Sequence, residues 1–126
     1  MWPSVTHPLV VLLGLSLVAI GLIAQLAPGL AATFYGVEAR TLPALVFVRA
    51  AGARDMVVGG ILIYLLVRRV ENRTLGIVLL IATLIPIVDA LGVLQASGMS
   101  PAFILHAGSI LPILILAIAL IAGRDA

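Results

Sequence analysis

Cysteine and lysine are both missing from this chain of 126 residues, and charged residues of any kind are few. The absence of cysteine excludes disulfides, thiolate catalysis, iron–sulfur clusters and cysteine-ligated zinc. All seven basic residues are arginines, and they form no stripe interleaved with aromatic side chains, which make up only 5% of the chain. The net charge of +2 therefore does not indicate nucleic-acid binding, and no nucleic-acid partner is expected.

Hydrophobic residues make up 63% of the sequence and charged residues 10%, where soluble proteins have roughly 45–50% and about 25%. A soluble domain of this size could not bury so much apolar surface, because small domains have a high ratio of surface to volume. A bilayer removes this difficulty. The composition therefore predicts an integral membrane protein whose main partner is membrane lipid.

Four apolar segments are long enough to cross the roughly 30 Å hydrocarbon core of a bilayer as helices, which takes about 20 residues. They run over about 9–27, 43–67, 74–96 and 101–122. Pro43 and Pro101 suit helix starts. Pro86 and Pro112 fall inside spans and are expected to kink them. The prediction is an all-α, integral membrane four-helix bundle that forms a single domain over residues 1–126.

The first span is predicted to be retained rather than cleaved as a signal peptide. Met1–Pro8 carries no arginine or lysine, and the apolar run that follows is about twice the length of a signal core. An excess of arginine marks the cytoplasmic side of a membrane protein. Here the turn between spans two and three and the C-terminal tail hold four arginines and the other side holds one: Arg68, Arg69, Arg73 and Arg124 against Arg40. We therefore expect a multi-pass cell-membrane protein with both termini in the cytoplasm.

The connection between spans one and two, Pro28–Leu42, is longer than a simple turn. Gly29–Tyr35 is predicted to form a short interfacial helix, with Phe34 and Tyr35 as anchors at headgroup depth. The alternative is a lid over a pocket, in which Tyr35 or Glu38 points inward.

Ionisable side chains inside the spans carry most of the information. Each charge at a helix centre costs about 2.5–3.5 kcal/mol on insertion scales, whereas each Leu, Ile or Val returns only about 0.3–0.6. The residues are Arg49, Arg54, Asp55, Asp89 and His106. From a rise of 1.5 Å per residue, they are expected near the midplane or in the outer half of the bilayer. The four formal charges sum to zero, which predicts one shared polar cluster.

Helical phase separates Arg49, Arg54 and Asp55 around span two, so this span is expected to contact two or three partners. Small residues along it would let neighbouring helices approach closely. They are Ala50, Ala51, Gly52, Ala53, Gly59 and Gly60, with Gly14 and Gly21 on span one.

Three interpretations of the cluster stay open. In the first, it lines a pocket that binds or transforms a small lipophilic molecule, which is favoured because intramembrane ionisable groups are costly. In the second, Arg–Asp pairs only join spans two and three, in a non-catalytic accessory or assembly subunit of a larger membrane complex. In the third, Asp55 and Asp89 relay protons in a small-solute or proton transporter that acts as a homo-oligomer. The lack of an inverted repeat or of paired broken helices argues against an autonomous transporter.

For the pocket interpretation, Asp89 and His106 are the candidate catalytic acid–base pair, because a neighbouring carboxylate fixes the tautomer of an imidazole. A metal site that uses Asp55 with these two residues is disfavoured by the nearby arginines, so no metal is predicted. The cofactor, and whether the chain is an enzyme, are left open.

The candidate ligand-binding residues are Arg49, Arg54, Asp55 and Tyr35. Arg49 or Arg54 would hold a carboxylate, phosphate or enolate oxygen through a bidentate fork. The expected ligand is accordingly a lipophilic or anionic small molecule that enters from the membrane or from the outer side.

Three further polar residues have smaller expected roles. Gln25 and Ser109 are minor candidates to complete the polar network, although a serine at this position more often bonds its own helix backbone. His7 precedes the first span and is expected to be a solvated end residue.

The polar residues lie in a recognisable pattern: Tyr35-Gly36-Val37, Arg49-x-x-Gly52-x-Arg54-Asp55-x-x-x-Gly59, Ile85-Pro86-Ile87-Val88-Asp89, and then His106. Over roughly Gly21–Leu120 the chain resembles a family of small four-span bacterial and fungal membrane proteins classed as a domain of unknown function, which is distantly similar to DoxX-like four-helix proteins. The resemblance implies a four-helix membrane bundle without an assigned activity. Some DoxX-like proteins serve quinone-linked oxidoreductases, and no motif here carries that role over.

Overall fold

The computed structural model describes residues 3–123, and over that range it contains six helical segments and no strand. They are α1 (Pro3–Leu26), α2 (Pro28–Tyr35), α3 (Leu42–Val67), α4 (Asn72–Ala82), α5 (Leu84–Ser97) and α6 (Pro101–Ala122). Because α4 and α5 follow one another as a single span, four helical units are long and apolar enough to cross a membrane. The predicted all-α membrane four-helix bundle is confirmed.

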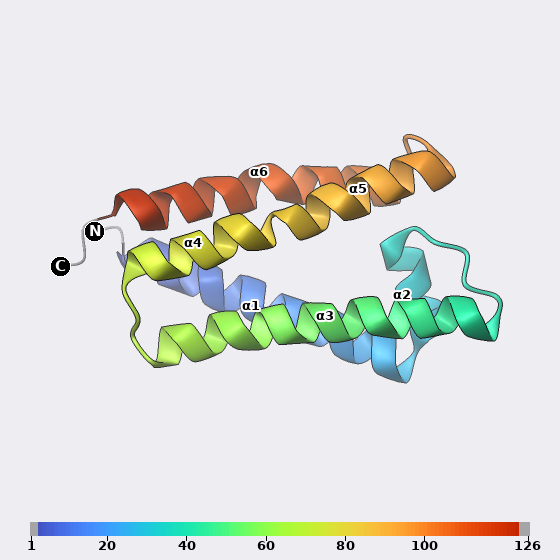
Figure 1. The fold of residues 1–126 in the computed structure, drawn as a ribbon, viewed down its shortest axis with the longest axis horizontal. Helices are drawn as coiled ribbons and strands as arrows, with labels where there is room; N and C mark the ends of the chain where they lie inside the picture. Colours follow the sequence, from blue (N-terminus) through green and yellow to red (C-terminus); the bar gives the residue numbers. More distant parts are fainter. Residues whose placement is uncertain (1–2, 124–126) are drawn as a thin grey trace.

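The helices form two layers (Figure 1). One layer is α1 packed along α3, and the other is α6 packed along α4 and α5. At one end lie the start of α1, the α3–α4 turn and the end of α6; at the other end lie α2 and the α5–α6 turn (Figure 1). There α2 contacts α1, α3 and α6, whereas α3 and α5 have little backbone contact.

Three of the arginines that predict the orientation lie in the α3–α4 turn or in the first turn of α4, at one end of the bundle (Figure 1). Arg68, Arg69 and Arg73 are exposed there. Arg124 lies outside the described residues. The assignment of this end to the cytoplasm stays a prediction.

Helix starts follow the predicted chemistry. Thr41 caps α3 and Ser100 caps α6, each by accepting a hydrogen bond from the backbone N–H three residues later, at 3.4 and 3.3 Å. Pro43 and Pro101 lie in the first turns that follow, where a missing N–H costs nothing.

Proline acts differently in the two spans that contain it internally. The helix α4 ends at Ala82, and α5 begins at Leu84. The ring of Pro86 clashes with the carbonyl four residues earlier, that of Ala82, and Pro86 has no N–H to donate to it, which explains a break at this point. By contrast, α6 runs through Pro112 as one helix.

Glycines bring α1 and α3 into close contact, as predicted. A Cβ on Gly52 would lie 3.0 Å from the carbonyl oxygen of Gly21, and one on Gly59 would lie 2.5 Å from that of Gly14. A Cβ on Gly52 would also overlap the Cβ of Ala24, so neither position accepts a side chain unless the helices move. Gly60, predicted to share this role, is different, because a Cβ there would meet no atom within 4 Å.

The core differs between the two ends of the bundle. Toward the end that holds the α3–α4 turn it consists of packed aliphatic side chains: Val10, Leu62, Leu75, Leu79, Leu116, Ala117 and Leu120. At the other end the buried residues are mostly alanines: Ala24, Ala31, Ala32 and Val48. Small side chains let α2 lie close against α1 and α3, and this contact sets the position of Tyr35.

The predicted interfacial helix Gly29–Tyr35 is present and one residue longer, Pro28–Tyr35. It ends at Gly36, whose φ of 72° is a left-handed conformation that favours glycine. The Val37 N–H donates to the Ala32 carbonyl at 3.0 Å and closes the helix end. Tyr35 is therefore held as the last helical residue, directly before a sharp change of chain direction.

Candidate functional site

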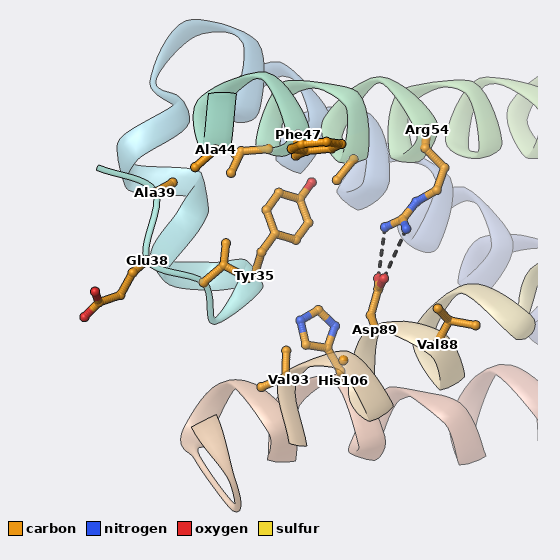
Figure 2. A pocket seen from close by; sticks show the side chains of 14 residues that line it. Tyr35, Glu38, Ala39, Ala44, Phe47, Arg54, Val88, Asp89, Val93 and His106 are labelled. Atoms are coloured by element: carbon orange, nitrogen blue, oxygen red, sulfur yellow. Dashed lines mark hydrogen bonds and ion pairs between the residues drawn. The ribbon is translucent and has the colours of Figure 1, made fainter. Parts of the chain in front are cut away.

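Arg54 on α3 forms hydrogen bonds with two carboxylates at once. Its Nη1 and Nη2 atoms donate to the two oxygens of Asp89 on α5, at 3.1 and 2.9 Å (Figure 2). Its Nε and Nη2 atoms donate to one oxygen of the neighbouring Asp55, at 3.1 and 3.0 Å. A single guanidinium thus joins the two layers of the bundle where α3 and α5 have little other contact.

Tyr35 completes the hydrogen bonding of Asp55. Its hydroxyl donates to the second Asp55 oxygen at 2.8 Å, and the Asp55 side chain is only 7% exposed. Burial, the hydrogen bond to Asp55 and the negative charge of Asp55 raise the pKa of Tyr35 above its ordinary value. Tyr35 therefore stays protonated and acts as a donor, so the inward orientation that the sequence left as an alternative applies to this residue.

His106 on α6 lies beside the same groups without being fully bonded. Its ring lies near Tyr35 and Asp89 (Figure 2). The Nε2 atom is buried, and it has no hydrogen-bond partner among the residues that the structure describes. Asp89 and His106, the predicted acid–base pair, line the same two grooves. We call Tyr35, Arg54, Asp55, Asp89 and His106 the polar cluster.

Two other predicted site residues lie elsewhere. Arg49 is exposed on α3 and lines neither groove. The structure does not bring its side chain into the polar cluster, because it projects from a different face of the helix than Asp55. Glu38 points away from the cluster and its side chain is 85% exposed (Figure 2).

The minor candidates form local contacts. Gln25 donates to the Arg49 carbonyl at 2.8 Å and so links α1 to α3. Ser109 donates to the His106 carbonyl at 2.7 Å, the backbone bond that its position favours. The expectation that His7 is a solvated end residue is wrong. Since α1 begins at Pro3, His7 lies within the helix, where it is half-buried and shares a 2.7 Å hydrogen bond with Asn72 at the start of α4.

The first of two grooves opens between α3 and α5 and has a volume of about 440 Å³ (Figure 2). Arg54, Asp89 and His106 lie along it, with Tyr35 from α2. Its remaining walls are mostly apolar: Val37, Ala39, Ala44, Phe47, Val48, Ala51, Val88, Gly92 and Val93, with Glu38 beside them. We call it the α3–α5 groove.

The second groove opens between α1 and α6 and has a volume of about 470 Å³. Tyr35, Asp89 and His106 line it too, so the polar cluster separates the two grooves. Its other walls are largely aliphatic: Leu13, Leu17, Ile20, Ile23, Ala31, Phe34, Ile85, Pro86, Leu105 and Ile113, with Ser16, Asp55 and Ser109 as the polar members. We call it the α1–α6 groove.

The charge of the cluster differs from the prediction. The predicted cluster included Arg49, and with this residue the four charges sum to zero. Without it, one positive charge on Arg54 faces two negative charges on Asp55 and Asp89, a formal sum of −1 over these three side chains. Both carboxylates already occupy the guanidinium of Arg54, so it has no free fork for an anionic ligand.

The arrangement of the described side chains does not favour a metal ion in the polar cluster. Within residues 3–123 no three His, Asp or Glu side chains come together as a set that could hold a metal ion. The Arg54 guanidinium lies between the carboxylates of Asp55 and Asp89, where a cation shared by them would have to sit.

Several groove residues could not be identified from the sequence. Phe34, Phe47, Gly92 and Leu105 line the grooves. In a chain with 63% hydrophobic residues, an apolar wall that faces a cavity looks the same as one that faces lipid. Only the packing of α2 between the layers distinguishes them.

No curated protein and no solved structure matches the chain. A family model does match it over residues 14–120, a range that includes every residue of the polar cluster. The resemblance to a family of unknown function is thereby confirmed, and the chain belongs to the family described as Domain of unknown function (DUF4267).

Proposed function

We propose that this protein binds a small lipophilic molecule within the membrane, with the polar end of the molecule at Asp89 and His106 and its apolar part in the adjoining grooves. The observation that supports this most is the convergence of two apolar grooves on one polar cluster. Volumes of about 440 and 470 Å³ fall within the roughly 300–1,000 Å³ that is usual for ligand sites.

Both grooves have apolar side chains at their mouths. Phe47 and Val88 in the α3–α5 groove are exposed, as are Phe34 and Leu105 in the α1–α6 groove. In a bilayer these openings face lipid, so a lipid-soluble molecule can enter sideways. A site with apolar walls and one polar region suits a ligand that has an apolar chain and one polar end.

Unsatisfied hydrogen-bonding capacity indicates where the polar end binds. Asp89 uses each of its oxygens once, for Arg54, and its side chain is still 22% exposed. The buried Nε2 atom of His106 has no partner, which is costly unless something else bonds to it. A ligand donor between these two side chains would satisfy both when the His106 proton is on Nδ1. The same two groups would then exchange a proton with the ligand, if the protein transforms it.

One observation favours the alternative of an accessory subunit with a purely structural cluster. The bidentate Arg54–Asp89 pair joins the two layers directly. However, the Arg54 side chain is 35% exposed, and both residues line a groove rather than a closed core. The pair is thus compatible with a ligand site. The accessory role and the distant likeness to DoxX-like proteins stay predictions, and no feature of the described residues favours the transporter.

A photoreactive dodecanol analogue with a diazirine in its tail tests the proposal. The protein is placed in phosphatidylcholine nanodiscs and irradiated, and labelled peptides are mapped by mass spectrometry. We expect saturable labelling of groove residues such as Leu17 and Leu105, suppressed by excess dodecanol. Uniform, non-saturable labelling of all lipid-facing helices would contradict the proposal.

Matched variants localise the binding. A Cβ at Gly92 or at Gly108 meets no atom within 4 Å, but only Gly92 lines a groove. Gly92→Leu should reduce labelling of the α3–α5 groove, and Gly108→Leu should not. For the α1–α6 groove, Leu105→Trp is compared in the same way with Ile104→Trp, an exposed neighbour outside both grooves.

A further inference from the structure

Resting on the proposed function, we infer that the ligand's polar end is a cation, and specifically a protonated amine on an alkyl chain. The polar cluster carries a formal charge of −1 and has more free acceptors than donors. An ammonium group carries a positive charge and donates hydrogen bonds, so it complements both properties.

The polar cluster has more free hydrogen-bond acceptors than free donors. A guanidinium has five N–H groups, and Arg54 uses four of them on Asp55 and Asp89. A carboxylate offers about four acceptor positions, of which Asp89 uses two and Asp55 three, counting the bond from Tyr35. The imidazole of His106 adds one acceptor and one N–H donor, and its Nε2 atom has no partner among the described residues. Acceptors thus remain on Asp55, Asp89 and His106, against one N–H each on Arg54 and His106.

Nearby charged side chains do not neutralise the negative charge of the polar cluster. Arg49 is exposed outside the grooves, so it leaves the negative charge of the cluster uncompensated. Glu38, at the rim of the α3–α5 groove, points away from the cluster and pairs with Arg40 at 3.7 Å, so these two side chains add no net charge. The rings of Tyr35 and Phe47 line the same groove, and aromatic faces attract ammonium groups. Charge and ring chemistry therefore favour the same kind of ligand.

A ligand with an anionic or a neutral polar end fits this site less well than one with an ammonium group. A carboxylate or phosphate would need the fork of Arg54, which two protein carboxylates already occupy, and it would face their charge. An alcohol offers one donor and no charge. An ammonium group donates up to three charge-assisted hydrogen bonds, which are roughly twice as strong as neutral ones.

Competition for the photolabel distinguishes these classes. Dodecylamine, dodecanol and dodecanoate are compared as competitors at neutral pH in phosphatidylcholine nanodiscs, and each concentration is corrected for partition into protein-free discs. We expect dodecylamine to compete about tenfold more effectively than dodecanol, and dodecanoate to compete least. Equal potency, or a preference for dodecanoate, would overturn the inference while leaving the proposed function intact. Non-saturable labelling would instead contradict the proposed function.

An Asp89→Asn variant tests the source of the preference. It removes one negative charge and leaves Arg54 and Asp55 as a neutral pair, so the advantage of dodecylamine over dodecanol should disappear. A preference that survives in the folded variant would show that the charge of the cluster is not its cause, and would overturn the inference. If the variant does not fold, the ranking of the three competitors on the unmodified protein still decides.

Discussion

Arg54 and Asp89 face each other across the two layers of the bundle and are joined by two parallel hydrogen bonds of 3.1 and 2.9 Å. They come from α3 and α5, which have little backbone contact with each other. This pair therefore holds together the part of the fold in which the grooves lie, and any test of ligand binding must separate its structural role from its chemical one.

Replacing Arg54 with leucine should destabilise the protein by about 2–3 kcal/mol, because it leaves two carboxylates unpaired inside the bundle. The loss is smaller than the roughly 3–5 kcal/mol of a fully buried pair, since Arg54 is 35% exposed. Arg49→Leu on the same helix is the control, and little change is expected because that side chain is exposed. Reversible unfolding in mixed micelles, followed by circular dichroism, measures both. Equal losses from the two variants would mean that the pair contributes nothing.

Tyr35→Phe should cost about 1.5–3 kcal/mol, the usual contribution of a hydrogen bond to a charged group. It removes the 2.8 Å bond to the buried Asp55 carboxylate without changing the ring. Tyr64→Phe is a matched control, because Tyr64 is 62% exposed. The same unfolding measurement applies, and a loss below a few tenths of a kcal/mol for Tyr35→Phe would show that Asp55 does not depend on this donor.

The raised pKa of Tyr35 predicts how stability depends on pH. Below about pH 10 the phenol is protonated in both the folded and the unfolded chain, so its stabilisation is fully present. Above that pH the unfolded phenol ionises first, and the free energy of unfolding must fall as pH rises. The chain has no lysine or cysteine to titrate in this window. In a Tyr64→Phe background, we expect a fall that a further Tyr35→Phe change abolishes; an unchanged slope would show that Tyr35 does not titrate differently on folding.

The sequence predicted the parts of this fold that depend on local pattern or on the cost of charge in lipid. The four spans, the helix starts at Pro43 and Pro101, and the short helix before Gly36 all follow from residues close together in the chain. Asp55 and Asp89 could be placed at the same site because a charge inside an apolar span needs a partner.

What the sequence could not provide is the direction in which each side chain points. Helical phase separates Arg49 from Asp55, but it does not say which of the two faces the neighbouring layer. The contact of α2 with α3, through its alanines, lets Tyr35 reach Asp55, whereas Arg49 lies exposed on another face of α3. The sign of the cluster's charge, and with it the expected ligand class, changes with this one side chain.

Close helix contact at Gly52 should make this position intolerant of larger residues. A Cβ there would lie 3.0 Å from the Gly21 carbonyl oxygen, so Gly52→Ala should cost about 1–3 kcal/mol as α1 and α3 move apart. Gly60→Ala, where a Cβ meets nothing within 4 Å, should be neutral or slightly stabilising because alanine favours helix. Unfolding in mixed micelles compares the two, and similar effects at both positions would contradict the predicted contact.

The two histidines of the chain should respond oppositely to the same substitution. His106→Phe removes a buried nitrogen that has no partner, so it should leave stability unchanged or raise it by up to about 1 kcal/mol. His7→Phe removes a 2.7 Å hydrogen bond to Asn72 and should lower stability by about 1 kcal/mol.

The two histidine variants should affect ligand binding in the opposite way to stability. His106→Phe should weaken saturable photolabelling by the dodecanol analogue, whereas His7→Phe, at the far end of the bundle, should not affect it. If replacing His106 does not lower stability but does weaken binding, then His106 serves ligand binding rather than the fold. If His106→Phe instead lost stability and kept binding, the imidazole would be a structural member of the bundle, and the polar end of the ligand would have to bind elsewhere.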